Sequence, residues 1–188
     1  MAEAQPRLLR QVDSFDPWRL HVTDPTNWPV GRVPSACLQD FRDRRSSPSF
    51  YEVPDEEALN EAASALAAMR MNRSLPTFFG LVLDAETISV ARTALTRTPG
   101  ATPFRSVNAR HVELTRATVE DVAAIAVAAF HDAAIPEDLG NSTRPGLFTF
   151  GPLEVARTLR RMIEQGKLTQ DGMRANLERA IAEALGES

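Results

Sequence analysis

A run of nine apolar residues at 122–130, Val-Ala-Ala-Ile-Ala-Val-Ala-Ala-Phe, constrains the fold more than any other part of this sequence. Thr118 and Asp121 precede it at the spacing of a helix N-cap pair. A helix with no polar side chain for about two and a half turns must be covered on nearly every side. We therefore expect a helix from Thr118 to about Ala134 that is the most enclosed helix of a packed domain.

Composition narrows the class of protein. The chain has 188 residues, 43% apolar and 24% charged, which suits one domain able to bury about two thirds of its unfolded surface. No apolar run approaches the ~20 residues of a membrane helix, and the first residues lack the basic and apolar regions of a secretory signal. Cys37 is the only cysteine, so no internal disulfide forms. These features predict a soluble cytoplasmic protein, and the preference for arginine over lysine indicates a GC-rich bacterial genome.

The chain divides into three parts by pattern. Residues 1–47 are rich in proline, hold both tryptophans and show no sustained period, which predicts an extended arm with short strand pieces packed on the core. Residues 48–150 alternate between strand-like and helix-like patterns and form the core. Residues 151–188 read as a C-terminal helical hairpin within the same domain.

The core repeats a strand followed by a helix three times, at intervals of roughly thirty residues. Its strands are expected at 49–53, 77–83 and 110–115, and its helices after Pro54, from Asp84 to about Leu95, and at 118–134. The stretch 135–151 is expected to be a loop. The fold class is α/β or α+β, with a small three- to five-stranded sheet. A mostly parallel sheet and an α+β sheet that includes an antiparallel strand from the arm both fit the pattern.

The hairpin consists of two amphipathic helices, 152–165 and 169–185. Gly166 is the expected stop of the first helix and Thr169 the expected N-cap of the second. The apolar stripe of the hairpin either packs on the sheet or contacts another subunit, which would make a homo-oligomer.

His111, Glu113 and Thr115 alternate along a strand, so their side chains share one face. Such a row could polarise water or a substrate hydroxyl, and it is also typical of the solvated face of an edge strand. His21-Val-Thr23 and His111-Val-Glu113 resemble the paired His-x-Thr or His-x-Ser motifs of 2H phosphoesterases. That resemblance implies acid–base roles for the two histidines, although the second copy lacks the hydroxyl that would contact phosphate.

Asp84 stands where a buried strand passes into a helix, a position at which open α/β sheets gather ligands. It could hold a magnesium ion or a ribose, or it could simply cap the following helix. No glycine-rich phosphate loop or nucleophile elbow is present, so no cofactor is expected. With three histidines and a single cysteine, no metal site is expected either.

A net charge of −4 argues against a dedicated nucleic-acid-binding protein. Two arginine clusters are local exceptions, one at Arg42, Arg44 and Arg45 and one at Arg157, Arg160 and Arg161. Acidic residues are interleaved with both clusters, which favours solvated surfaces over phosphate contacts.

Because catalytic signatures are missing, we expect an accessory or regulatory protein that binds another protein, with an antitoxin, immunity or adaptor role. The expected contact residues are Trp18, Trp28, Arg157, Arg160 and Arg161. The first alternative is a small hydrolase or phosphoesterase-like enzyme whose site draws on His111, Glu113, Asp84 and His21. The second is arginine-mediated nucleic-acid binding. Convergence of the acid–base residues in one pocket would favour the enzyme, and an exposed apolar patch on the arm or hairpin would favour the binding protein.

Overall fold

The computed structural model describes residues 7–24, 26–42, 47–92, 94–132 and 146–187. Six strands form one sheet. They are β1 (Arg7–Gln11), β2 (Ser49–Val53), β3 (Phe78–Leu83), β4 (Leu95–Arg97), β5 (His111–Leu114) and β6 (Gly146–Phe150). Their order is β4-β5-β2-β1-β3-β6, and every neighbouring pair is antiparallel.

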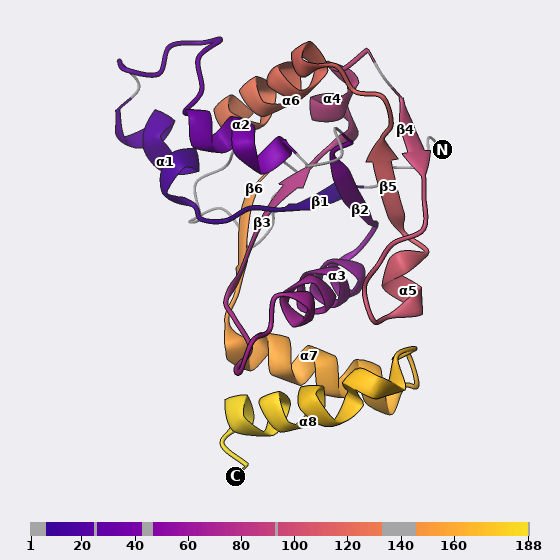
Figure 1. Cartoon of the computed structure of the whole chain (residues 1–188). Coiled ribbons are helices and arrows are strands. Elements are labelled where there is room, and N and C mark those ends of the chain that lie inside the picture. Colours follow the sequence, from indigo (N-terminus) through magenta and orange to yellow (C-terminus); the bar gives the residue numbers. More distant parts are fainter. Residues whose placement is uncertain (1–6, 25, 43–46, 93, 133–145, 188) are drawn as a thin grey trace.

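Helices cover both faces of the sheet (Figure 1). The four on one face are α1 (Asp16–Thr23), α2 (Ser35–Phe41), α4 (Ala85–Ser89) and α6 (Val119–Asp132). The four on the other face are α3 (Glu56–Met69), α5 (Arg105–Asn108), α7 (Pro152–Glu164) and α8 (Asp171–Leu185). On this second face α3 lies between the sheet and α7, and α8 lies beyond α7. Each face has its own hydrophobic cluster.

The N-terminal segment contains a short strand, as predicted, but it forms two helices where an extended arm was expected. It contributes β1, which lies between β2 and β3 and pairs antiparallel with both, and it then forms α1 and α2. Leu8 and Leu9 are 2% and 0% exposed on opposite faces of the sheet. A short strand buried on both faces shows no alternation of polar and apolar residues, which is why its sequence pattern was uninformative.

The sheet is antiparallel, which corrects the mostly parallel arrangement and matches the α+β alternative with a strand from the arm. Because β2 and β3 both run antiparallel to β1, they run parallel to each other on either side of it. The sheet also exceeds the predicted three to five strands. The helix predicted from Asp84 to Leu95 ends at Ser89, so the chain returns as β4, and β6 lies within the predicted loop 135–151.

The two alanine-rich helices are buried to different degrees. Thr118 and Asp121 cap α6 reciprocally, with distances of 3.1 Å and 2.9 Å between each backbone nitrogen and the other's side-chain oxygen. However, only one side of α6 is buried, and Val122, Ala124 and Ala128 remain partly exposed. Nine of the fourteen residues of α3 are buried. The more enclosed helix is therefore α3, which corrects the expectation for 122–130.

The apolar side of α7 packs against α3 and α8, so the chain itself covers the stripe of the hairpin. Gly166 ends the first helix with a left-handed φ of +69°. Thr169 does not cap the second helix, which begins at Asp171, and its hydroxyl instead donates to the carbonyl of Pro103 at 3.0 Å. None of the helices in the described ranges is long and apolar enough to span a bilayer.

Candidate functional site

A cavity of about 880 Å³ opens on the α3 side of the sheet, where the two central strands separate. The β1–β2 pairing ends at Leu9 and Tyr51, whereas β1 continues to Gln11 beside β3. The floor of the cavity comes from β1, β2 and β5. Its walls come from the last turn of α3, from Gln39, Asp40, Arg42 and Ser47, and from Pro99 and Ala101. The wall and floor residues are mainly polar, so the cavity offers several groups that can hydrogen-bond a bound molecule.

His111 and Glu113 lie together in this cavity. They stand opposite Tyr51 and Ser49 in the β2–β5 pairing, on the α3 face of the sheet. His111 Nε2 lies 4.0 Å from Glu113 Oε1, and the two side chains are 7% and 31% exposed. β5 lies between β4 and β2, so these residues do not form the solvated face of an edge strand.

The imidazole of His111 is held by Thr98. Its Nδ1 lies 2.9 Å from Thr98 Oγ1 and 3.3 Å from the Thr98 carbonyl oxygen. Burial lowers the pKa of His111, and the neighbouring Glu113 charge opposes that shift only in part. The ring is therefore neutral near pH 7. When Nδ1 carries the proton, it can donate to this carbonyl, and Nε2 then has a free lone pair.

Tyr51 completes the acid–base group. Its ring centroid lies 4.9 Å from that of His111. Burial raises the pKa of Tyr51 to about 12, and the charge of Glu113 contributes to the rise. The phenol therefore keeps its proton and can donate a hydrogen bond. Sequence reasoning missed this residue, although Tyr51 is the only tyrosine and stands two positions from Ser49 on a predicted strand.

Arg10 fixes the rim of the cavity. Its Nε and Nη2 donate to the carbonyl of Asp40 at 2.9 Å and 2.6 Å, and its Nη1 donates to the carbonyl of Ser49 at 2.7 Å. The guanidinium carbon lies 5.9 Å from the ring centroids of both Phe41 and Phe50. One arginine thus joins the end of α2 to the start of β2. No pattern in the sequence identified it.

The carboxylate of Asp40 accepts a hydrogen bond from Trp18 of the N-terminal segment. Trp18 Nε1 donates to Asp40 Oδ2 at 2.8 Å, and the backbone nitrogen of Asp13 donates to Asp40 Oδ1 at 3.2 Å. Burial raises the pKa of Asp40, and these hydrogen bonds oppose the rise. Trp18 is 1% exposed, so its ring belongs to the core and presents no surface to a partner.

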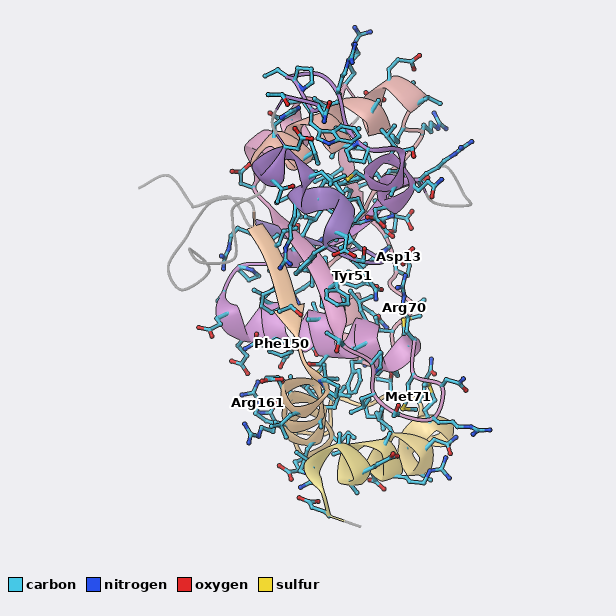
Figure 2. The ribbon with its side chains drawn as sticks, turned by 90° about the vertical axis from the view of Figure 1, so that its left-hand side faces the viewer. Asp13, Tyr51, Arg70, Met71, Phe150 and Arg161 are labelled. Carbon is cyan, nitrogen blue, oxygen red and sulfur yellow. The ribbon has the colours of Figure 1, made fainter. Side chains whose placement is uncertain are left out.

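The mouth of the cavity carries charges from several segments. Arg70, just after α3, pairs with Asp13 at 2.9 Å. Figure 2 shows Asp13 and Tyr51 at the level between the upper helices and α3, with Arg70 close below Asp13. Arg42, just after α2, is exposed and also lines the cavity.

The other predicted catalytic residues are elsewhere. Asp84 follows the end of β3 that pairs with Leu8, away from the cavity, and it caps α4 by accepting from the backbone nitrogen of Thr87 at 2.8 Å. His21 belongs to α1, and its side chain lies outside the described part of the structure. Because α1 is a helix, His21 lacks the strand setting of 2H phosphoesterases.

The remaining partner-binding candidates are dispersed. Trp28 is half-buried, with its ring 6.0 Å from that of Phe130. Arg157 and Arg161 are exposed on α7, and Arg160 forms a bidentate pair with Glu187. Figure 2 places Arg161 on the opposite side of the molecule from Arg70. Arg44 and Arg45 lie outside the described residues. Arg42 lines the cavity together with Arg70, the residue that Figure 2 places opposite Arg161, so the nucleic-acid alternative gains no common arginine surface from them.

The described residues give little support to catalysis by a cysteine nucleophile or to metal binding. Cys37 is fully buried, and burial raises the pKa of its thiol to about 12, which disfavours the nucleophilic thiolate. Among the residues that the structure describes, no three His, Cys, Asp or Glu side chains are grouped to hold a metal ion.

The chain matches no protein-family model, no curated protein and no solved structure.

Proposed function

We propose that the protein binds a small polar molecule in the cavity beside β5 and acts on it by proton transfer through His111, as a small hydrolase would. One observation carries the proposal. A neutral imidazole and a carboxylate share a polar cavity, and the ring is oriented by Thr98 so that Nε2 faces the carboxylate. This is the arrangement of a general base with a charged partner.

Each group has a defined role in this proposal. His111 Nε2 takes a proton from water or from a substrate hydroxyl as the new bond forms. Glu113, 4.0 Å away, stabilises the imidazolium that results. The phenol of Tyr51, kept protonated by its raised pKa, donates to the oxygen on which negative charge develops. His111 then returns the proton to the leaving group.

The test is hydrolysis of three chromogenic probes: p-nitrophenyl acetate, p-nitrophenyl phosphate and bis(p-nitrophenyl) phosphate. The variant His111→Gln should lower the rate on the accepted probe by about 100-fold, because general base catalysis contributes roughly 10²–10⁴. His131→Gln, which removes a histidine on α6 away from the cavity, is the matched control and should leave the rate unchanged. Equal rates in the wild-type protein and His111→Gln, or rates no higher than buffer on all three probes, overturn the proposal.

Binding to another protein is a second proposal, supported by one observation. Val30, in the segment between α1 and α2, is 90% exposed, although Trp28 two residues earlier is anchored on Phe130. Single exposed apolar side chains are common on protein surfaces, so Val30 marks only the position at which a contact is sought. The simplest partner is a second copy of the chain. Light scattering should then show that Val30→Asp reduces self-association, whereas Val119→Asp, at an 81% exposed position elsewhere, does not.

A further inference from the structure

Two charges of opposite sign that line the same cavity have no ion-pair partner among the described residues. Glu113 is 31% exposed, and its neighbour within 4.0 Å is the neutral His111. Arg42 is exposed and makes no ion pair with the described residues. Both residues line the cavity.

The other charges around the cavity have partners. Asp13 pairs with Arg70 at 2.9 Å. The two carboxylate oxygens of Asp40 accept hydrogen bonds from Trp18 and from the backbone of Asp13. Arg10 donates to two backbone carbonyls, and its positive charge acts on the nearby Asp40 carboxylate by opposing the rise in its pKa, so these two charges offset each other. One surplus negative charge and one surplus positive charge therefore remain.

The contacts of Arg10 place these two charges at the same end of the cavity. Arg10 bridges the carbonyl of Asp40, two residues before Arg42, and the carbonyl of Ser49. Ser49 is the cross-strand neighbour of Glu113. The segment that bears the cation and the strand that bears the anion are thus joined through one side chain.

We propose that the ligand of this cavity is a zwitterion, an aminocarboxylate whose ammonium group pairs with Glu113 and whose carboxylate pairs with Arg42. The inference rests on the proposed function of the cavity and specifies the class of molecule that it accepts. A ligand with both charges compensates both residues at once and gains two charge-assisted hydrogen bonds. A simple amine or a simple acid compensates one residue and leaves the other unpaired.

The test uses ω-amino acids of increasing length, from glycine to 8-aminooctanoate, as a ruler for the gap between the two charges. Tyr51 is the only tyrosine and lies in the cavity, so one ¹³C-labelled tyrosine ring reports binding there by NMR. Each amino acid is compared with the amine and the carboxylic acid of the same length, for example 6-aminohexanoate with hexylamine and hexanoate. At the best length, the amino acid should bind about tenfold more tightly than either, which is the gain from one added ion pair in a partly shielded site.

Two charge-removing variants separate the contributions. Glu113→Gln should abolish the preference for the amino acid over the acid, and Arg42→Gln should abolish the preference over the amine. The controls are Glu164→Gln and Arg73→Gln, which remove exposed charges outside the cavity and should change neither preference.

Equal affinity for the amino acid and either single-charge analogue at every length overturns the zwitterion inference, as does an unshifted tyrosine signal throughout the series. The hydrolysis assay depends on His111 and uses uncharged and phosphate probes, so the proposed function survives or fails separately. If the probes are hydrolysed in a His111-dependent way while no amino acid binds preferentially, the site is active and its ligand is not a zwitterion.

Discussion

Two glutamates on the α3 side of the sheet have opposite surroundings. Glu61, in α3, is 3% exposed and lies 2.5 Å from Lys167 Nζ and 3.2 Å from Arg110 Nη2. Glu113, in β5, is 31% exposed and lies beside a neutral imidazole in an open cavity. Arg110 and His111 are consecutive in the chain, so the closed cluster and the open site adjoin each other.

The difference separates a structural charge from a functional one. The cluster of Glu61, Arg110 and Lys167 connects α3, the residue before β5 and the turn between α7 and α8. The Glu61 carboxylate already pairs with two cations, so it is not available to bind a ligand. Glu113 has no cation among the described residues, so its charge is available. Both regions contain a glutamate. The presence of cations beside the carboxylate distinguishes the region that stabilises the fold from the region that can bind a ligand.

The largest effect should come from Glu61→Gln. Removing the buried carboxylate leaves Arg110 and Lys167 facing each other without a counter-charge, and breaking a buried ion pair costs about 3 kcal/mol. Denaturant unfolding should show this loss in the free energy of unfolding.

Glu113→Gln is the matched comparison, and it should change the free energy of unfolding by less than about 1 kcal/mol because no ion pair is broken. Equal losses in the two variants would show that Glu113 is also structural, and the contrast between the two regions would fail.

Gly100→Ala should have the next largest effect, on the cavity side. A methyl group there would lie 2.8 Å from Asn108 Cα and 3.1 Å from His111 Cβ. Because one of these neighbours is backbone, the segment must shift, which typically costs about 2 kcal/mol. Gly172→Ala is the control, since a methyl group on Gly172 meets nothing within 4 Å in α8. Unfolding measurements should show a lower free energy of unfolding for Gly100→Ala only. Equal stability of the two variants would mean that the backbone beside His111 shifts at little cost.

The local elements could be predicted from the sequence and the pairing of strands could not. The strands at 49–53, 78–83 and 111–114 and the caps at Asp84 and Thr118 depend on residues close in sequence. The position of β1 depends on partners about forty and seventy residues away. Since β1 is covered on both faces, its five residues carry no alternation that would reveal it.

The enclosure of the helices was also non-local. The run 122–130 is more apolar than α3, yet α3 is the more buried because α7 covers its far side. Exposed alanines cost little, so α6 tolerates a partly open face. The sequence shows which side chains are apolar enough to be buried. Which helix is enclosed depends on where the C-terminal hairpin packs.

Part of the candidate site followed from the period of a strand. Alternation alone placed His111 and Glu113 on one face. Tyr51 and Arg10 could not be assigned, because their roles depend on the register of β2 with β5 and on the separation of β1 from β2. Trp18 was expected at an interface by residue type, but its hydrogen bond to Asp40 and its 1% exposure place it in the core.

A smaller effect is expected in the pH dependence of stability. Burial lowers the pKa of His111 below its ordinary value of 6.5, so the unfolded chain binds more protons just below that pH. Wild-type stability should fall by up to about 1 kcal/mol on acidification from about pH 7.5 to about pH 5.5.

His111→Gln should lack this part of the slope. Asp40, whose pKa is raised by burial, contributes with the opposite sign at lower pH, and it does so in both proteins. Thermal unfolding across this range checks the prediction, and parallel curves for the two proteins would mean that His111 titrates as freely as in an unfolded chain.

The smallest effect on stability is expected at the rim, where Asp13 and Arg70 form an ion pair with side chains 81% and 52% exposed. Asp13→Asn should change the free energy of unfolding by no more than about 0.5 kcal/mol, because water screens both charges. The same substitution leaves Arg70 without its counter-charge beside the cavity. If compensation is what separates closed from open regions of this face, the variant should bind hexanoate a few-fold more tightly than the wild-type protein, with the tyrosine ring as reporter. An unchanged affinity for hexanoate would mean that release of a rim charge does not create binding capacity, and that the open character of the site depends on Glu113 and Arg42 alone.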